Sequence, residues 1–445
     1  MSVNEYDAVV VGGGIVGAVQ ALLLAQQGIS TLLIEATLPE AITEPLQQRS
    51  VALSHRSFEL LLARELWPTD VACPINEIHV TNRGSFGSAR ITALDLNAAA
   101  LGYVVANHRL EHHLRQLVRS QKNIEFVQPA TARLIHNSAT GVELTVSPSR
   151  HGHGESRSVR VGDTQSDADA VPNHAVPDKD FTARCRLLIA ADGTHSHIRQ
   201  SLGLNVTQHD YDQVAVVANV ECQLDHQHIA HERFTDSGPL ALLPLSPRCM
   251  AMVYTAHAGD GDVLKTMPDE EFLRLLQARF GGKLGRFKAV GRRAVFPLTL
   301  SESDSQTAGN CVLIGNSART LHPVAGQGLN LALRDVFALA ASVDRCFTPD
   351  SGQGLGNVAG HSRSDLSHVL AEFQRQRLSD QRNTVRRTDI LARVFSDNKL
   401  PVLGPVRGAG LFLLNGLVPL RKRFAADSAG IGIPLGFDRE SRSPK

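Results

Sequence analysis

The stretch VVVGGGIVGA, residues 9–18, decides the fold, because it sets Gly12, Gly14 and Gly17 in the G-x-G-x-x-G register. A valine-rich run precedes these glycines and an apolar run, residues 19–25, follows them, which is the pattern of a strand, a tight turn and a buried helix. Two glycines of such a turn let the backbone approach a pyrophosphate, and the third lets the helix pack on the strand. The stretch therefore predicts a dinucleotide-binding turn, with the phosphates at the helix N-terminus.

The next apolar run, residues 30–34, ends at Glu35 and completes a βαβ unit. A carboxylate at the end of the second strand can bind the ribose hydroxyls of an adenosine, and its charge would repel a 2′-phosphate. With a strand before the glycines, a helix after them and an acid at this position, dinucleotide binding is favoured over a fortuitous glycine turn. We expect an α/β fold of the Rossmann type.

Two later segments also run from a strand into a turn. LLIAADGTHS, residues 187–196, ends a buried strand at Asp192 and Gly193, where ligands bind in open α/β sheets. Taken alone, it is better interpreted as an ordinary turn. VLIGNSARTLHPVAGQGLNLALRD, residues 312–335, leads from a strand through a glycine loop into a helix at about Leu329. Its backbone N–H groups and helix dipole can hold a phosphate or an electron-rich ring edge.

Composition excludes several classes of protein. The 445 residues are 42% apolar and 20% charged, which indicates a soluble globular chain of two or three structural units. Lys plus Arg number 45 and Asp plus Glu 44, so a nucleic-acid partner is not expected. The six cysteines form no C-x-x-C pair, which argues against a disulfide framework and a cysteine-based metal site. The N-terminus does not have the pattern of a signal peptide, and we expect a cytoplasmic protein.

Histidines offer a second candidate metal pattern, His226-x-His228-x-x-His231. The pattern lies in a polar stretch without a supporting carboxylate on a helix, so surface histidines are the preferred interpretation and no metal is assigned. A polar tract at residues 149–182 has the composition of a flexible insert. Strand-like runs dominate residues 214–300 and indicate a β-rich unit.

The three strand-turn segments, in this order, resemble the aromatic-ring hydroxylase group of FAD-dependent monooxygenases. HPVAGQGLNLALRD, residues 322–335, is similar to the signature of the ubiquinone-biosynthesis hydroxylases. Short stretches that include RSVALS (49–54), ERFTDSGPLALLPLS (232–246) and GNSARTLHP (315–323) look most like the members that act on 2-polyprenyl-6-methoxyphenol. The resemblance spans nearly the whole chain apart from its polar inserts.

The resemblance implies FAD contacts along the chain. The glycine turn and Glu35 would hold the ADP half, two arginines the phosphate and ribityl region, the Asp-Gly turn both FAD and NADPH, and the last glycine loop the isoalloxazine. The implied positions are Gly12, Gly14, Gly17, Glu35, Arg49, Arg109, Asp192, Gly193, Asn316, Pro323, Gly326, Gln327, Gly328, Leu329 and Asn330. Two positions depart from the family pattern: Asn316 replaces an Asp, and Ala332 replaces a Gly.

The resemblance also implies a domain order. It comprises an FAD-binding part at 1–205 with the flexible insert at 149–182, a β-rich substrate domain at 206–299, a second FAD-binding part at 300–398, and a helical tail at 399–445. The tail combines an apolar stretch with Arg421-Lys422-Arg423. Such a segment can lie at the inner face of a membrane, and it can equally dock on the protein's own core or on a partner subunit.

The implied reaction is hydroxylation of a polyprenyl phenol by NADPH or NADH and O2, through a flavin C4a-hydroperoxide, within or beside a ubiquinone-biosynthesis complex. No catalytic acid or base is indicated by the sequence. Two alternatives stay open: a soluble aromatic-acid hydroxylase of the 4-hydroxybenzoate type, which needs cations for the substrate carboxylate, and a flavin-binding scaffold without turnover.

Overall fold

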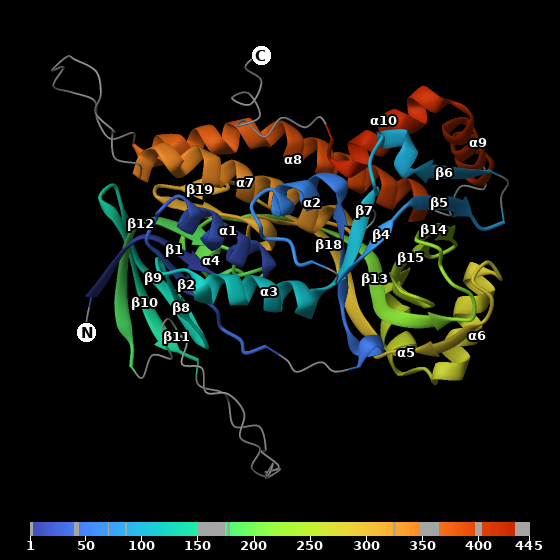
Figure 1. Cartoon of the computed structure of the whole chain (residues 1–445), viewed down its shortest axis with the longest axis horizontal. Coiled ribbons are helices and arrows are strands. Elements are labelled where there is room, and N and C mark those ends of the chain that lie inside the picture. Colours follow the sequence, from blue (N-terminus) through green and yellow to red (C-terminus); the bar gives the residue numbers. More distant parts are fainter. Residues whose placement is uncertain are drawn as a thin grey trace, which may run out of the picture.

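The structure is a computed structural model, and Figure 1 follows its chain from the N-terminal to the C-terminal end. It describes residues 3–39, 44–69, 71–84, 87–149, 174–175, 179–323, 326–347, 365–396 and 403–431. Most of the predicted insert at 149–182 lies outside the described residues. Its last two residues belong to a strand that begins at Phe181, so the end of the insert was predicted too late. The alternation of buried residues from Phe181 onward places that strand in the sheet.

The first sheet has parallel strands at its centre. Its strands are β11 His174–Ala175, β8 Ile124–Val127, β2 Thr31–Ile34, β1 Val3–Val11, β12 Phe181–Ala190, β10 Gly141–Pro148 and β9 Ala130–Ser138, in this order, with β20 Cys311–Leu313 on β12 and β19 Thr307–Ala308 on β20. β1 pairs in parallel with β2 and β12, and β12 pairs in parallel with β20. The carboxyl ends of these strands, which carry the three strand-turn segments, therefore meet at one edge.

The helices of the described chain have the following bounds. They are α1 Ile15–Gln26, α2 His55–Leu62, α3 Asn107–Ser120, α4 His197–Ser201, α5 Gly261–Thr266, α6 Asp269–Phe280, α7 Gln327–Phe347, α8 Leu366–Ser396, α9 Leu403–Gly416 and α10 Val418–Ala429, and short 3-10 turns are η1 Pro45–Gln47, η2 Ala93–Leu96, η3 Ala258–Asp260 and η4 Gly315–Ser317.

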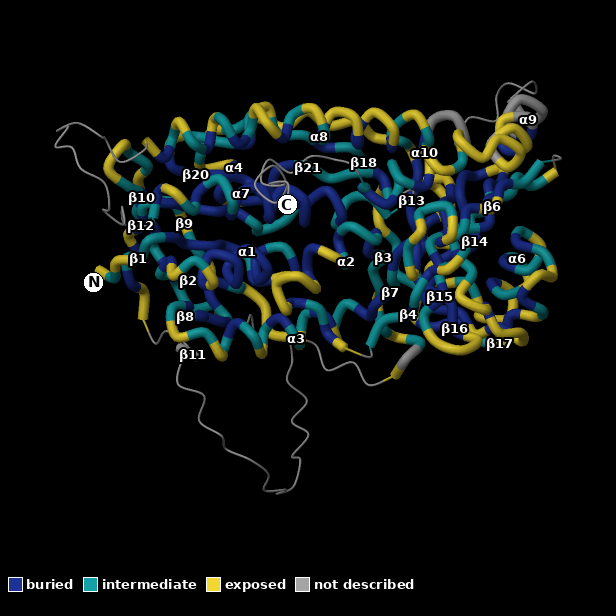
Figure 2. The backbone as a smooth tube through the Cα atoms, turned by 45° about the horizontal axis from the view of Figure 1, so that its top comes forward, coloured by how far each residue is buried: buried dark blue, intermediate teal, exposed yellow. Residues whose placement is uncertain are grey.

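Alternate residues of β1 enter two cores. Ala8 and Val10 pack with α1, α3 and α7 on one face, while Val9 and Val11 pack with β9, β10 and α4 on the other. A strand buried on both faces reads as a continuous apolar run, which is why the sequence shows no polar alternation there. Figure 2 shows α1 and the central strands as the buried middle of this half of the molecule.

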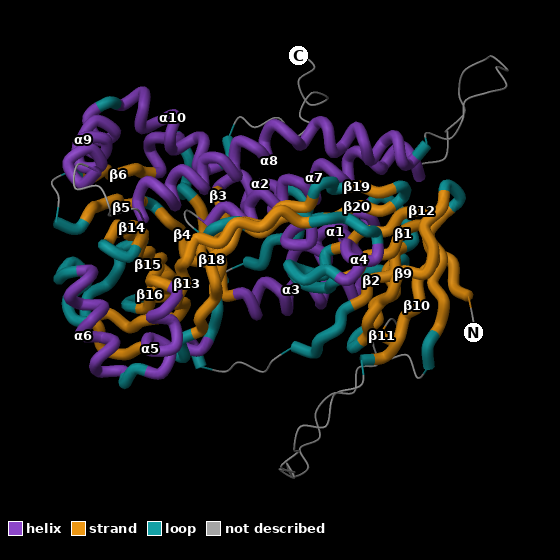
Figure 3. Tube along the Cα trace, turned by 180° about the vertical axis from the view of Figure 1, so that it is seen from behind, coloured by secondary structure: helices purple, strands orange, loops and turns teal. Residues whose placement is uncertain are grey.

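The second sheet is mostly antiparallel. Its strands are β21 Arg319–Thr320, β18 Ala294–Ser303, β13 Val206–Cys222, β16 Cys249–His257, β15 Gly238–Ser246, β14 Ile229–Thr235, β5 Glu77–Asn82 and β6 Ser88–Thr92, in this order, with β17 Phe287–Val290 on β13. β14 and β5 pair in parallel. Two strands of the second sheet, β5 and β6, therefore lie within residues 1–205, which were predicted to belong to the FAD-binding part. Figure 3 shows the long strands β13 and β18 of the second sheet extending toward the first sheet.

The two faces of the second sheet differ in what covers them. On β15, Leu240 and Leu242 pack into a core with α6. The alternate residues Pro239, Ala241 and Leu243 line a cavity on the opposite face. Alternate residues of β15 therefore face the packed core on one side of the sheet and the cavity on the other side.

A third sheet, β3 Ser50–Ser54, β7 Gly102–Ala106 and β4 Ala72–Ile75, lies beside α2 and β15, and the sequence did not predict it. β3 and β7 pair antiparallel from Ser50 opposite Ala106 to Ser54 opposite Gly102. The helical tail was predicted correctly as helical: α9 and α10 pack Leu411 and Ala425 into small apolar clusters with the second sheet. Among the described residues, no helix is long and apolar enough to cross a membrane.

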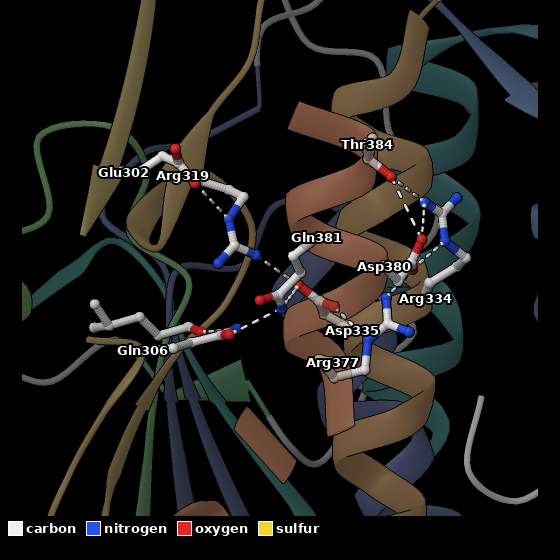
Figure 4. A network of polar contacts seen from close by, with 10 residues as sticks. Glu302, Gln306, Arg319, Arg334, Asp335, Arg377, Asp380, Gln381 and Thr384 are labelled. Atoms are coloured by element: carbon white, nitrogen blue, oxygen red, sulfur yellow. Dashed lines mark hydrogen bonds and ion pairs between the residues drawn. The ribbon is translucent and has the colours of Figure 1, made fainter. Parts of the chain in front are cut away.

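A buried polar network joins α7 to α8 (Figure 4). Arg377 Nε donates to Asp335 Oδ1 at 2.7 Å, and Arg334 Nε donates to Asp380 Oδ2 at 2.9 Å. Gln381 Nε2 also donates to Asp335, at 2.9 Å. Buried charges are tolerated when they are paired and hydrogen-bonded in this way, so the network fixes α8 along α7.

Candidate functional site

The glycine turn between β1 and α1 is shaped by close backbone packing at two of its three glycines. A Cβ on Gly12, whose φ is +104°, would lie 2.3 Å from the Ala191 carbonyl oxygen, and a Cβ on Gly17 would lie 1.8 Å from the Gly12 oxygen. A Cβ on Gly14 would meet no atom within 4 Å. Gly14 is exposed at the N-terminus of α1, so the helix end has free space in front of it. Such a cradle fits a pyrophosphate.

Glu35 lies at the end of β2 and reaches back to this turn. Its Oε2 accepts a hydrogen bond from the Gly13 N–H at 2.7 Å. Its Oε1 accepts from the Thr37 N–H at 2.8 Å and from the Thr37 hydroxyl at 2.6 Å. The carboxylate is thus held at the carboxyl edge of the sheet, next to the glycine turn, which is the position that a ribose-binding acid requires.

The second and third strand-turn segments meet at Ser317. The Ser317 hydroxyl donates to Asp192 Oδ1 at 3.0 Å and accepts from the Gly193 N–H at 3.1 Å. Asp192 Oδ2 also accepts from the N–H of Ile198 in α4, at 3.3 Å. Asn316, the residue before Ser317, is exposed and lines the cavity described below. The structure therefore brings Asp192, Gly193 and Asn316 together at one edge.

The third segment forms one wall of that cavity. Pro323, Gly326, Gln327, Gly328 and Leu329 line it, while the two residues between Pro323 and Gly326 lie outside the described part. A Cβ on Gly328 would meet no atom within 4 Å, so the first turn of α7 also opens onto free space. A ring edge placed there would face backbone N–H groups of a helix N-terminus.

Asn330, which also lines the cavity, is buried and its side chain is fully engaged with backbone groups. Its Oδ1 accepts from the Ser54 N–H at 2.8 Å, and its Nδ2 donates to the Gly326 oxygen at 2.7 Å and the Ala52 oxygen at 3.2 Å. The side chain therefore fixes the glycine loop against β3. This role could not be foreseen, because β3 itself was not predicted.

The two predicted arginines are exposed. The guanidinium carbon of Arg49 lies 5.0 Å from the centre of the Phe296 ring, and Arg109 lies in the first turn of α3. Burial raises the pKa of the nearby Glu111 carboxyl, and the charges that act on it include Glu35 and Arg49. Arg49 and the start of α3 are therefore electrostatic neighbours of the glycine-turn carboxylate.

A cavity of about 760 Å³ lies between the third segment and the open face of the second sheet. Its walls come from β3, β5, β6, β14, β15, β16, the start of α7, and the tail helices α9 and α10. Most lining side chains are apolar, and they include Ile78, Val80, Ile91, Ala230, Phe234, Ala241, Leu243, Val253, Leu411 and Phe424. A volume of this size holds a drug-sized ligand with most of its surface buried.

Glu232 is the carboxylate in this cavity wall. It lies on β14 between Ala230 and Phe234 on the face that lines the cavity, with Ala241 and Val80 opposite it on the two neighbouring strands. Burial raises the pKa of its carboxyl to about 7. Sequence reasoning missed this residue, although the alternation of Ala230, Glu232 and Phe234 on one strand face was a signal for it.

A family model described as an FAD binding domain matches residues 5–373. The chain belongs to this family. The match covers the glycine turn, the Asp192-Gly193 turn and the third segment, whose geometry leaves room for a pyrophosphate at one helix N-terminus and a ring at another. The predicted FAD cofactor and the Rossmann-type FAD-binding fold are confirmed for this FAD-binding chain.

Relatives of this FAD-binding chain carry names of hydroxylases. Ubiquinone hydroxylase UbiL of Rhodospirillum rubrum is 29% identical over 427 residues, which cover 95% of this chain and 89% of the relative. 3-Demethoxyubiquinol 3-hydroxylase of Escherichia coli is 27% identical over 416 residues, covering 92% and 95%. The structure of p-nitrophenol 4-monooxygenase PnpA from Pseudomonas putida DLL-E4 superimposes with a TM-score of 0.71 at 16% identity, covering 97% and 100%. The predicted class, an FAD-dependent hydroxylase, is confirmed.

The histidines of the FAD-binding chain need one correction. His226 and His231 are buried, with 3% and 8% of their surface exposed, so they are not surface residues as predicted. His226 Nε2 bonds the Ser246 carbonyl at 2.8 Å, and its Nδ1 accepts from the His228 N–H at 3.0 Å. Cys73, His226 and His228 place ligand atoms within 4.8 Å of one another. Burial raises the pKa of the Cys73 thiol to about 11, and His226 already bonds backbone through both nitrogens, so we assign the cluster no metal.

Proposed function

We propose that the protein hydroxylates the ring of a polyprenyl phenol in ubiquinone biosynthesis, with NAD(P)H and O2 as co-substrates. The cavity carries this proposal, because a large apolar space adjoins the glycine loop at the start of α7. A phenol ring placed against the loop would leave its prenyl chain among the apolar side chains of the second sheet. Those walls also exclude water from the reacting centre.

The chain's own residues would divide the work on the cofactor. When bound, FAD carries electrons from NAD(P)H to O2 and activates one oxygen atom for transfer. The open space at Gly14 would take the pyrophosphate, Glu35 the ribose, and Arg49 and Arg109 the phosphate and ribityl region. The loop from Gly326 to Leu329 would hold the isoalloxazine, with Asn316 toward the ribityl chain. The turn at Asp192 and Gly193, at the carboxyl edge of the first sheet, would bind both FAD and the nicotinamide nucleotide.

We infer 2-polyprenyl-6-methoxyphenol as the substrate. The hydroxylase names of relatives that cover most of the chain support a quinone precursor. Of the described side chains lining the cavity, none is an arginine or a lysine. A 4-hydroxybenzoate carboxylate would therefore be buried there without a cation, which is costly. A neutral methoxyphenol carries no such cost.

We also infer a peripheral contact with the inner face of a membrane. The outer surface of the tail helices, which we call the α9–α10 surface, exposes large apolar side chains. They are Phe412, Leu413, Leu417, Val418, Leu420 and Phe424. Phe424 lines the cavity as well, so the α9–α10 surface adjoins the cavity. Lys422 and Arg423 are exposed beside it, whereas Arg421 is paired with Asp95 at 3.0 Å. A substrate dissolved in lipid would reach the cavity from this side.

The proposed reaction is tested with purified, FAD-loaded protein and 2-geranyl-6-methoxyphenol, a short-chain member of the substrate class. NADPH and NADH are supplied in turn, and the product is analysed by mass spectrometry with ¹⁸O2. We expect incorporation of one labelled oxygen atom into the ring, and none into 4-hydroxybenzoate. Tightly bound FAD without any labelled product from either nucleotide would contradict the proposal and favour the scaffold alternative.

A further inference from the structure

Among the described residues that line the cavity, one is anionic, Glu232, and most of the others are apolar. Glu232 lines the cavity from an apolar sheet face, and the loop at the start of α7 lines the same cavity. Within the described part of the chain, its carboxylate has no hydrogen bond or ion pair. A carboxylate left without a partner on an apolar wall costs stability, and such costs are typical of functional positions.

We propose that Glu232 is the catalytic base that takes the proton of the substrate's phenolic hydroxyl. The inference rests on the proposed function and deepens it by naming the residue that activates the ring. The phenolic O–H bond breaks, the proton goes to a carboxylate oxygen of Glu232, and the electron pair stays on the phenolic oxygen. The resulting phenolate is more electron-rich at its ortho and para carbons, which is what an electrophilic oxygen transfer requires.

The surroundings of Glu232 suit this exchange. Burial raises its pKa to about 7, near the pH at which a general base works best. Among the other lining residues, the titratable side chain is His231, whose pKa burial lowers to about 4, so it is neutral. His231 turns its ring to Phe280 and His79, with centroids 5.4 and 5.9 Å away, on the opposite face of the sheet.

The charged neighbours on β14 and β5 also point away from the cavity. Arg233 Nε donates to the Arg279 carbonyl at 3.0 Å, and Lys283 Nζ lies 2.8 Å from His79 Nδ1, both on the far face. The described side chains that line the cavity from β3, β6, β15, β16, α7, α8, α9 and α10 carry no charge. No cation among the described lining residues therefore holds Glu232 ionised, and its charge responds to the substrate proton.

Kinetics of the full-length holoenzyme test the proposal. Glu232→Gln keeps the shape of the side chain and removes the base, so we expect the hydroxylation kcat to fall about 100-fold or more. The KM for 2-geranyl-6-methoxyphenol should rise by a much smaller factor than kcat falls, because only one hydrogen bond to the bound phenol is weakened. Wild-type kcat should rise with pH through about 7, and the variant should lose this limb. Glu221→Gln removes an exposed carboxylate from β13 of the same sheet and serves as the matched control with unchanged kcat. An unaltered pH profile and kcat in Glu232→Gln would overturn the proposal.

Equilibrium binding of ligands measures the effect of the Glu232 charge without turnover. Above the carboxyl pKa, ionised Glu232 accepts a hydrogen bond from a neutral phenol and repels a phenolate. Glu232→Gln should therefore weaken binding of 2-geranyl-6-methoxyphenol and strengthen binding of ionised 2-geranyl-4-nitrophenol, followed by the absorbance of the nitrophenolate. Changes of equal sign for both ligands would indicate a merely structural residue and refute the role. If hydroxylation fails in the wild type while the opposite-sign changes appear, the proposed reaction fails but the proton-accepting site stands.

Discussion

The glycines of the turn between β1 and α1 differ in which substitutions they tolerate. We predict that Gly14→Glu yields a folded protein without FAD, because the added carboxylate would occupy the open space and repel the pyrophosphate. Gly14 has φ −68°, a conformation open to any residue, so folding is spared. FAD content by absorbance and folding by circular dichroism are the measurements.

Two alanine variants are the controls for this turn. Gly14→Ala should fold and retain FAD, since its Cβ meets no atom within 4 Å. Gly17→Ala should lower the melting temperature, since its Cβ would lie 1.8 Å from the Gly12 oxygen. Stoichiometric FAD in Gly14→Glu would refute the assignment of the turn to the pyrophosphate.

Asn316→Asp is predicted to keep FAD and measurable turnover. The change preserves size and acceptor capacity, and the exposed position adds no buried charge. FAD fluorescence after gel filtration and steady-state NAD(P)H oxidation test it. A colourless or unfolded variant would mean that the amide donor is essential.

The charge of Glu232 should also affect the pH dependence of the protein's stability. A carboxyl whose folded pKa is raised from 4.5 to about 7 costs no stability below pH 4.5, costs progressively more as the pH rises to 7, and carries its full cost above that. Glu232→Gln should therefore melt at a higher temperature than the wild-type apoprotein at pH 8 and at an equal temperature at pH 4. Thermal scans at both values measure this. A lower melting temperature of the variant at pH 8 would contradict the unpaired state of the carboxylate.

The sequence predicted local geometry only where its signal is local. Gly12, Gly14 and Gly17 carry a spacing that can be read directly from the chain, and their geometry agrees with the expected turn. Glu232 has no such spacing, because its surroundings come from Val80 and Ala241 on neighbouring strands. The burial of His226 was missed for the same reason, since its partner Ser246 lies on another strand.

At the scale of elements, the α7–α8 contact depends on a buried carboxylate. Asp335 is 2% exposed and accepts from Arg377 and Gln381. We predict that Asp335→Asn lowers the free energy of unfolding by up to about 3–5 kcal/mol, because the buried guanidinium of Arg377 keeps only Asp380 of its two carboxylate partners. Urea unfolding measures the loss. Glu372→Gln, which removes an exposed ion pair with Arg375 on α8, should leave stability unchanged. Equal effects of both changes would count against a structural role for the network.

Long, strongly patterned elements were predicted closely and short paired ones were not. The helix expected to begin at about Leu329 is observed as α7, Gln327–Phe347, because its apolar periodicity is local. β3 and β7 were missed, although RSVALS was noted as a motif. β3 finds its partner about fifty residues away, and no turn signal links the two strands.

At the scale of the whole molecule, the α9–α10 surface is expected to bind lipid. We predict that the double variant Phe412→Ser, Leu417→Ser reduces sedimentation with vesicles of anionic phospholipid, because it removes apolar side chains that are 64% and 51% exposed. FAD content should be unchanged. Neutral vesicles should retain less protein than anionic ones, since Lys422 and Arg423 act through charge.

The matched control is Ile135→Ser, which changes a 51% exposed side chain on β9 of the first sheet. It should not alter sedimentation. Wild-type protein that ignores anionic vesicles would exclude lipid and favour a partner protein of a ubiquinone-biosynthesis complex as the occupant of the α9–α10 surface.

Several strands pair with partners that come later in the sequence: β5 pairs with β14, β12 with β20, and β18 with β21. This order affects how the chain folds during translation. β12 cannot gain β20 until Leu313 has been made, and β18 cannot gain β21 until Thr320 has been made. During translation, the emerging chain therefore carries unpaired strand edges, which invite aggregation. We expect the nascent chain to be held by chaperones on the ribosome and to capture its yellow cofactor only after release.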